Sequence, residues 1–126
     1  MKYLLDTHVL IRMFADDELP AIVNEIIDNP RIVKYISIVS LWEIVIKQNI
    51  NRLKLDYNVE QMLDEIRDSS INVLPIEYRH LEIYSHLPLI HRDPFDRLLI
   101  SVSLADEMTI ITSDEDIQRY EVDWLW

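Results

Sequence analysis

The sequence predicts an α/β fold in which helices cover both faces of a parallel β-sheet. Short segments rich in β-branched and aromatic residues alternate along the chain with segments whose apolar residues recur at helical spacing. Such alternation is typical of parallel sheets, because consecutive parallel strands need a crossover connection. The chain has 126 residues and no internal repeat, low-complexity tract or linker, so we expect a single domain over residues 1–126.

Five segments have the composition of short strands. The first begins the chain and ends in an acid, Asp6. The last is the shortest and contains Trp124. The predicted strands cover residues 2–6, 32–37, 72–76, 109–112 and 122–124.

The segments between these strands carry helical patterns. Apolar residues recur at i, i+3, i+4 and i+7 in residues 59–66, and Pro30 ends the first helical pattern. The predicted helices cover residues 19–29, 40–48, 59–66, 77–87 and 94–107. Residues 11–14 and 22–27 offer more apolar surface than the core obviously needs, which is compatible with core packing or with a binding partner.

Composition excludes several functional classes. The chain has no cysteine and no glycine, so disulfides, zinc–thiolate sites, thiol catalysis and glycine-rich phosphate loops are ruled out. The net charge of −11 disfavours nucleic-acid binding unless cations or local basic patches intervene. No apolar run is long enough to span a membrane. Asp6 interrupts the first apolar run too early for a signal peptide, so we expect a cytoplasmic protein.

Four acidic residues are predicted to meet at one edge of the sheet. Asp6 ends the first strand, and Glu43 lies in the first turn of the helix after the second strand. Asp96 lies in the first turn of the long apolar helix, and Asp114 follows the fourth strand. Because ligands of open parallel sheets bind beyond the carboxyl ends of the strands, these acids form a candidate site.

Converging carboxylates repel one another unless a cation or protons neutralise them. Hard oxygen ligands favour Mg²⁺ or Mn²⁺. Such ions neutralise phosphoryl charge and activate water, which suits the hydrolysis of phosphate esters. We therefore interpret Asp6, Glu43, Asp96 and Asp114 as metal ligands and as the catalytic residues.

Helix capping is an alternative explanation for two of these acids. Ser40 and Glu43 have the spacing of a capping box, in which Glu43 bonds back to the Ser40 backbone N–H. Asp6 could cap a segment that begins at Thr7. Capping does not exclude metal binding, so both roles stay open.

The other two acids have the same alternative. Asp93 followed by Pro94 is typical of a helix start, which makes Asp96 a favourable charge near the positive end of the helix dipole. Asp114 could cap a short helix running through Ile117. The shared sheet edge is the observation that favours a functional site over four separate caps.

Other polar residues give weaker signals. Thr7 and Thr112 could orient water beside the acids, or they could be ordinary strand and turn residues. Five basic residues could contact an RNA backbone, although a solvated surface is the simpler explanation: Lys47, Arg52, Lys54, Arg92 and Arg97. The four histidines show no metal-ligand spacing and are expected on the surface or in loops: His8, His80, His86 and His91.

Three longer motifs surround the acids. They are Leu4-Leu5-Asp6-Thr7-His8, Ser40-Leu41-Trp42-Glu43-Ile44 with Lys47, and His91-Arg92-Asp93-Pro94-Phe95-Asp96-Arg97-Leu98-Leu99-Ile100. Together with Thr112-Ser113-Asp114 they resemble, in order and in spacing, the motifs of the PIN-domain nucleases. Within that family the resemblance is to the VapC-type toxins of bacterial toxin–antitoxin pairs, and it spans the whole chain.

This resemblance implies a three-layer α/β/α sandwich with a parallel sheet of about five strands. It implies Mg²⁺- or Mn²⁺-dependent cleavage of RNA, with Asp6, Glu43 and Asp96 as core acids and Asp114 as the fourth. Asp93 and Asp116 are further nearby acids of lower rank. The resemblance also implies a homodimer and a cognate antitoxin that wraps the toxin and blocks its site.

One departure from the family pattern is visible. Members usually carry a glycine before a Lys-Leu pair after the helix that holds the second acid, whereas this chain has Gln48-Asn49-Ile50-Asn51-Arg52-Leu53. Asparagine is the next-best residue at a left-handed helix terminus, so the turn remains possible and the four acids are unaffected.

Two other functional classes compete with a nuclease. A receiver-type signalling domain would need an acid at the end of the third strand and a lysine after the last core strand, but the third strand runs into Pro75-Ile76-Glu77 and no lysine lies near Asp114. A PIN-like binding module without catalysis would be favoured by a missing acid, and here all four acids are present.

Overall fold

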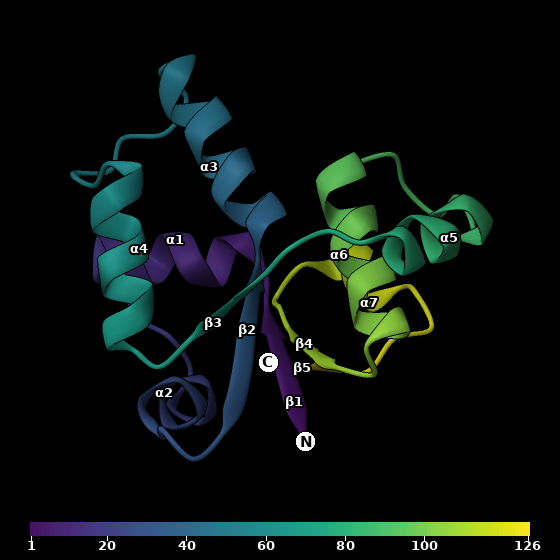
Figure 1. Cartoon of the computed structure of the whole chain (residues 1–126), viewed down its shortest axis with the longest axis horizontal. Coiled ribbons are helices and arrows are strands. Elements are labelled where there is room, and N and C mark those ends of the chain that lie inside the picture. The colour runs from purple at the N-terminus through teal and green to yellow at the C-terminus, as the bar shows by residue number, and fades with distance from the viewer.

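A five-stranded sheet forms the centre of the molecule (Figure 1). The structure is a computed structural model that describes residues 1–126. The strands pair in the order β3-β2-β1-β4-β5, and every pair is parallel. They are β1 (Lys2–Leu5), β2 (Val33–Ser37), β3 (Asn72–Leu74), β4 (Thr109–Ile111) and β5 (Trp124–Leu125). The predicted strands and their parallel arrangement are confirmed.

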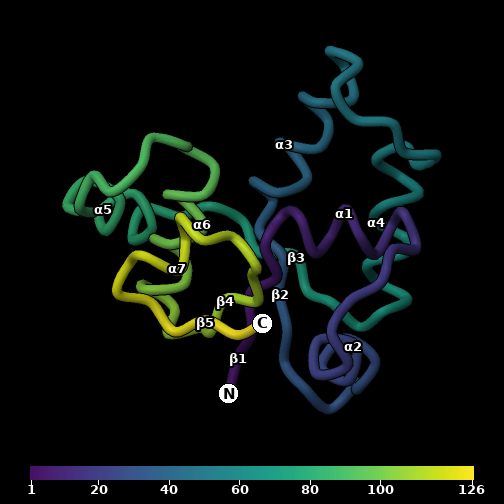
Figure 2. Tube along the Cα trace, turned by 180° about the vertical axis from the view of Figure 1, so that it is seen from behind, coloured from purple at the N-terminus to yellow at the C-terminus, as the bar shows by residue number.

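Helices cover both faces of this sheet, so the predicted α/β/α sandwich is confirmed. On one face lie α1 (Thr7–Ala15), α2 (Ala21–Asp28), α3 (Ile38–Asn49) and α4 (Val59–Asp68). On the other face lie α5 (Tyr78–His86), α6 (Pro94–Ala105) and α7 (Glu115–Gln118), and the view from behind shows the same division (Figure 2). None of these helices combines the length and apolar character needed to cross a membrane.

Each face of the sheet has its own hydrophobic core, because successive residues of a strand point to opposite sides. Leu5 belongs to the larger core, beneath α1 to α4, whereas its neighbour Leu4 belongs to the smaller core beneath α6 and α7. The same alternation separates Ile111 from Ile110 on β4. Burial of both faces therefore fixes the register of the central strands.

The first helix was not among those predicted from the sequence. Residues 11–14 were noted only as an apolar segment, but they belong to α1, which also buries Val9, Leu10 and Phe14 in the larger core. Val23, Ile26 and Ile27 of α2 lie in the same core. Most of the apolar surface on these two segments therefore packs inside the protein.

The start of α3 also differs from the prediction. The helix begins at Ile38 instead of Ser40, because the Ser37 hydroxyl caps it by accepting a hydrogen bond from the Val39 N–H at 3.1 Å. Ser40 and Glu43 therefore do not form a capping box, and Glu43 lies in the second turn of the helix instead of the first.

Four residues have left-handed backbone angles in this chain without glycine. Their φ values lie between 53° and 58°, and each residue stands within two positions of the end of a helix: Asp16, Asn51, Ser70 and Glu107. Asn51 occupies the turn after α3 with φ of 58°, which confirms that asparagine retains this turn.

The order of the strands defines where a ligand would bind. The chain leaves the central strand β1 for β2 and β3 on one side and then crosses to β4 and β5 on the other side. The carboxyl ends of β1 and β4 therefore form a topological switch point, the usual place for a site in such sheets.

Candidate active site

Asp6 lies at the switch point, directly after β1, and is only 1% exposed. Its Oδ1 accepts a hydrogen bond from the Val9 N–H at 2.8 Å, so it caps α1, and its Oδ2 accepts one from the Thr112 hydroxyl. Burial raises the pKa of Asp6, and these two hydrogen bonds offset only part of that effect. The nearby charge of Asp114 raises the pKa further.

Asp96 lies in the first turn of α6, where Asp93 is the N-cap and accepts hydrogen bonds from the N–H groups of Phe95 and Asp96 at 2.9 and 3.1 Å. Burial raises the pKa of Asp96 to about 6. A hydrogen bond with His91 lowers this pKa, whereas the carboxylates of Asp93, Asp114 and Glu43 raise it.

Asp114 caps the short helix α7, as the alternative prediction of helix capping held. Its Oδ1 accepts hydrogen bonds from the N–H groups of Asp116 and Ile117 at 2.8 and 3.3 Å. Its own N–H donates to the Thr112 hydroxyl at 3.0 Å. Because that hydroxyl also donates to Asp6, the buried Thr112 holds the ends of β1 and β4 in a fixed relation.

Glu43 reaches the same edge from α3 and is 4% exposed. Its Oε2 accepts a hydrogen bond from the Lys47 ammonium at 2.8 Å. Its Oε1 has no partner at all, and it is the single buried side-chain polar atom in the protein in this condition. An unpaired carboxylate oxygen is costly to bury, so this atom points to a missing cation or donor.

Thr7 connects two of the elements that carry the acids. Its buried hydroxyl donates to the Ser40 Oγ at 2.9 Å, which ties the start of α1 to the first turn of α3. The four secondary candidates therefore have different roles. Thr7 and Thr112 connect the elements that carry the acids, Asp93 caps α6, and Asp116 is exposed beside Arg119.

The four acids meet electrostatically, but they are not a closed metal centre. Asp114 raises the pKa of both Asp6 and Asp96, and Glu43 raises that of Asp96. No three histidine, aspartate or glutamate side chains are arranged as a ready-made metal site. The donor set nevertheless fits a hard divalent cation, because it consists of carboxylate oxygens, contains one unpaired buried oxygen, and holds two acids with raised pKa values.

Three residues next to this site, of which Arg97 and Tyr120 are buried and His91 is half-buried, make contacts that the sequence analysis did not predict. Arg97, predicted to lie on a solvated surface or to contact RNA, is 6% exposed and donates hydrogen bonds to the backbone carbonyls of Leu87 and Pro88 instead. His91 lies beside Asp96 and bonds the buried Tyr120. The position of His91 just before Asp93-Pro94 was a usable signal, whereas nothing in the sequence linked it to Tyr120.

His91 lies in the loop before α6, as expected, whereas His80 contradicts the expectation that the histidines lie on the surface or in loops. It is fully buried on α5 and forms a hydrogen bond with Asp106 at the opposite end of α6 from the acids. It therefore contributes to helix packing and lies outside the candidate site.

Comparison with known proteins identifies the family and the fold of this chain. The family model described as PIN domain matches residues 3–123. No match was found among curated proteins. Among solved structures, VapBC2 from Rickettsia felis, bound to a promoter DNA fragment, is similar with a TM-score of 0.74 and 18% identity, over 99% of this chain and 98% of that one.

Two further structures have the same fold. DNA-bound VapBC from Salmonella typhimurium has a TM-score of 0.70 and 15% identity, over 99% of this chain and 97% of that one. FitAcB from Neisseria gonorrhoeae has a TM-score of 0.61 and 18% identity, over 98% of this chain and 96% of that one. At these identities the similarity establishes the fold.

Proposed function

The chain belongs to the PIN domain family, and we propose that it is a divalent-metal-dependent endoribonuclease that acts as the toxin of a toxin–antitoxin pair. The observation that carries this proposal is the unpaired, buried Glu43 Oε1 beside acids whose charges raise the pKa values of Asp6 and Asp96. The carboxylates at this edge outnumber the Lys47 ammonium that bonds Glu43. A bound cation would therefore favour the approach of a phosphodiester substrate.

Asp6, Glu43, Asp96 and Asp114 would hold the metal, Mg²⁺ or Mn²⁺. A bound ion of this kind supplies charge neutralisation for the phosphate and activation of the attacking water. The chain itself supplies the carboxylates, each held by a helix-capping hydrogen bond, a threonine hydroxyl, a lysine or, for Asp96, a histidine. In the proposed reaction the water oxygen bonds to phosphorus, the bond from phosphorus to the 3′-oxygen breaks, and that oxygen takes up a proton, which leaves a 5′-phosphate and a 3′-hydroxyl.

Basic residues around the acids would contact the RNA backbone. Lys47 is the best placed, because it already bonds Glu43 and its side chain is 36% exposed. Arg92 is exposed next to Asp93, at the start of α6. Buried Arg97 is unsuited to this role.

The proposed activity is tested by incubating purified protein with a mixed RNA pool, with and without Mn²⁺. Cleavage should require the metal and should be lost in Asp6→Asn. Asp64→Asn, which changes an exposed acid on α4, is the matched control and should cleave normally. Metal-independent cleavage, or full activity in Asp6→Asn, would contradict the proposal.

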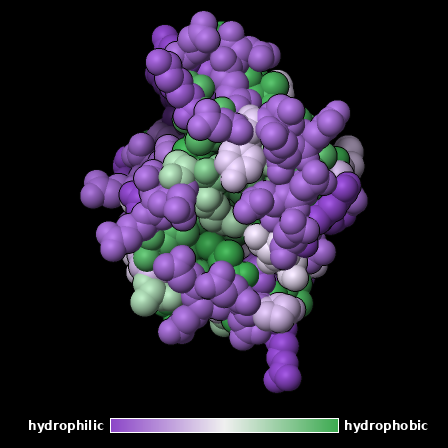
Figure 3. All heavy atoms as spheres, turned by 90° about the vertical axis from the view of Figure 1, so that its left-hand side faces the viewer, coloured by the Kyte–Doolittle hydropathy of each residue, from purple (hydrophilic) through white to green (hydrophobic).

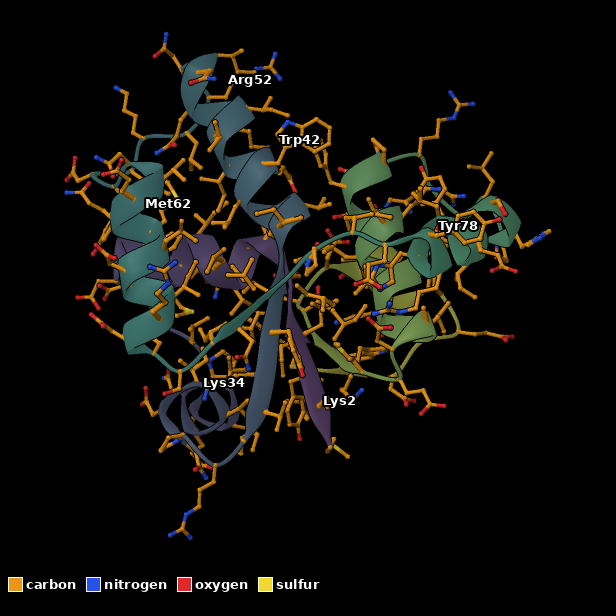
Figure 4. All side chains as sticks on the ribbon, viewed as in Figure 1. Lys2, Lys34, Trp42, Arg52, Met62 and Tyr78 are labelled. Carbon is orange, nitrogen blue, oxygen red and sulfur yellow. The ribbon has the colours of Figure 1, made fainter.

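We also propose a homodimer, formed through an apolar surface next to the acids. A pocket of about 210 Å³ lies between α3, α5 and α6, and its lining includes Trp42, Leu81 and Phe95. Trp42 is 59% exposed and projects from α3 toward α6 (Figure 4), where its ring lies 5.3 Å from that of Phe95. A two-fold interface here would bring two acidic edges side by side, and Trp42→Arg should yield monomers in sedimentation analysis.

The proposed antitoxin needs a different surface. A cleft of about 620 Å³ lies where the end of α1 meets the loop between α3 and α4, and its lining includes Phe14, Leu55 and Tyr57. The side of the molecule that carries α4 is largely hydrophilic but has a hydrophobic band (Figure 3). An amphipathic antitoxin segment could bury such apolar surface and place an arginine among the carboxylates.

Growth assays test this part of the proposal. Expression of the protein alone in bacterial cytoplasm should slow growth, and Asp96→Asn should remove the effect. Co-expression of the neighbouring small open reading frame should restore growth, and its product should co-purify with the protein. Normal growth despite abundant folded protein would argue against a toxin while leaving a nuclease of narrow specificity intact.

A further inference from the structure

A hydrogen-bonded chain leads away from Asp96 into the protein interior. The Asp96 Oδ2 lies 3.1 Å from the His91 Nε2, and the His91 Nδ1 lies 2.8 Å from the Tyr120 hydroxyl. Tyr120 is 5% exposed. Its hydroxyl also accepts hydrogen bonds from the Arg97 Nη1 at 2.9 Å and from the His91 backbone N–H at 3.2 Å.

The number of hydrogen bonds that this hydroxyl can donate and accept determines which atom donates in each hydrogen bond between Tyr120, His91 and Asp96. A phenolic oxygen has one proton to donate and two lone pairs to accept with. The Arg97 guanidinium and the His91 backbone N–H are obligate donors and occupy both lone pairs. The Tyr120 proton must therefore point to the His91 Nδ1, which leaves Nε2 protonated and donating to the Asp96 Oδ2.

The surroundings make this chain rigid. Arg97 also donates to the backbone carbonyls of Leu87 and Pro88, at 3.2 and 2.8 Å, and its guanidinium lies 5.2 Å from the centre of the Tyr84 ring. These contacts fasten the segment before α6, which carries His91, to α6 itself. The imidazole therefore has a fixed position as well as a fixed proton.

We propose that Tyr120 is a positioning residue that locks His91 in the tautomer that donates to Asp96. The lock fixes one oxygen of that carboxylate and leaves Oδ1, which accepts no hydrogen bond from the protein, free for a cation. The tautomer itself does not depend on any metal. The consequence for metal binding rests on the proposed function, because it assumes that Asp96 is a metal ligand.

The protein contains a matched control at the other end of α6. There the His80 Nδ1 accepts a hydrogen bond from the Glu77 N–H at 3.0 Å, and its Nε2 lies 2.8 Å from the Asp106 Oδ2. This pair has the same tautomer, but it is set by a backbone group and lies away from the four acids. Changes to His80 therefore report the effect of losing a histidine–aspartate bond on the fold alone.

The decisive measurement is the nitrogen NMR spectrum of the histidine rings in metal-free protein. With four histidines in the chain, the His91 signals are assigned by their loss in His91→Gln. Wild-type His91 should show a protonated Nε2 and an unprotonated Nδ1. Tyr120→Phe should redistribute the proton between the two nitrogens, while the His80 signals and the circular dichroism spectrum stay unchanged. A Tyr120→Phe variant whose His91 signals match wild type would overturn the proposal.

Calorimetric titration with Mn²⁺ then tests the consequence. Tyr120→Phe and His91→Leu should bind Mn²⁺ about 10-fold more weakly, because groups that orient a metal ligand typically have effects of this size. His91→Gln keeps a donor near the position of Nε2 and should restore most of the affinity, and His80→Gln should match wild type. Equal Mn²⁺ affinity in His91→Leu and wild type would overturn the positioning role even if Tyr120→Phe failed to fold. Wild-type protein that binds no Mn²⁺, but shows the expected tautomer change, would support the lock and contradict the proposed function instead.

Discussion

At each end of α6 an aspartate bonds a histidine, but the pKa of the aspartate is shifted in opposite directions at the two ends. At its N-terminal end Asp96 bonds His91, and at its C-terminal end Asp106 bonds His80. The two carboxylates are equally hidden, with side chains 12% and 10% exposed. Burial raises the pKa of Asp96 to about 6. Burial would raise that of Asp106 as well, but hydrogen bonds from Arg79 and His80 outweigh it and the pKa is lowered.

The difference lies in the neighbours of each pair and not in the pair itself. Asp106 receives two hydrogen bonds from the Arg79 guanidinium, at 2.7 and 3.2 Å, and its charge is thereby compensated within the chain. Asp96 faces the carboxylates of Asp93, Asp114 and Glu43, and among its side-chain neighbours the hydrogen bond from His91 favours its charged form. The charge at one end of the helix is therefore compensated within the chain, whereas the other end keeps an excess of negative charge that the proposed cation would neutralise.

The largest expected difference between the two ends is in catalysis. Asp96→Asn should lower the rate of metal-dependent RNA cleavage about 100-fold or more, because it removes a charged ligand without changing side-chain volume. Asp106→Asn should leave the rate per folded molecule unchanged. Similar losses in the two variants would show that α6 acts only as a scaffold and that Asp96 has no special role.

The response to metal should separate the two ends next. Mn²⁺ at 100 times its dissociation constant should stabilise wild-type protein by about 2.7 kcal/mol, because it binds the folded acids and not the unfolded chain. Asp106→Asn should keep this gain, whereas Asp96→Asn should lose most of it. Thermal melts with and without Mn²⁺ measure the effect, and a wild-type melting temperature indifferent to Mn²⁺ would favour capping roles alone.

In metal-free protein the same two substitutions should change stability in opposite directions. At pH 7.5, Asp96→Asn should raise the free energy of unfolding by about 1 to 2 kcal/mol, since it removes a charge held among other carboxylates. Asp106→Asn should lower it by about 1 kcal/mol, because a neutral amide replaces the carboxylate bonded to buried His80. Urea denaturation gives both values, and a shared sign would refute the contrast drawn here.

The pH dependence of stability follows from the direction of each pKa shift. In Asp96 the folded pKa of about 6 exceeds the ordinary value of 3.8, so the folded state binds more protons between these values and stability falls as pH rises through them. Asp106, with its lowered pKa, contributes stability above its ordinary pKa and loses it only in stronger acid. Urea midpoints from pH 4 to pH 7 should therefore fall in metal-free wild type and fall less steeply in Asp96→Asn.

Much of this site was accessible from the sequence, for a specific reason. Alternating strands and helices place the residues after β1 and β4 and the start of α6 at one edge, so Asp6, Asp96 and Asp114 could be grouped without a structure. Asp6 and Asp114 are also helix caps, as the alternative reading held. In Asp6 and in Asp114, the same side chain caps a helix and belongs to the candidate site.

The errors have equally specific causes. Helix α1 was missed because its apolar residues form an almost continuous run, in which helical periodicity is hidden. The start of α3 was misplaced because Ser37 and Ser40 are both plausible caps, and only the structure shows that the Ser37 hydroxyl takes that role. The link from His91 to Tyr120 could not be predicted, because it joins residues 29 positions apart in the sequence that share no periodic pattern.

The smallest expected effect lies just beyond the C-terminal end of α6, at Glu107. This residue is exposed and has φ of 53°, a conformation that strains residues with a Cβ atom but not glycine. Glu107→Gly should therefore raise the free energy of unfolding by somewhat less than about 1 kcal/mol, since the relief of strain exceeds the added entropy of the unfolded chain. Glu65→Gly, at an exposed interior position of α4, is the matched control and should lower the free energy of unfolding by about 1 kcal/mol.

Because the C-terminal end of α6 is a structural contact only, Glu107→Gly should change the urea midpoint without changing Mn²⁺ affinity or RNA cleavage. A loss of cleavage in this well-folded variant would show that the two ends of α6 are coupled and would remove the contrast between them.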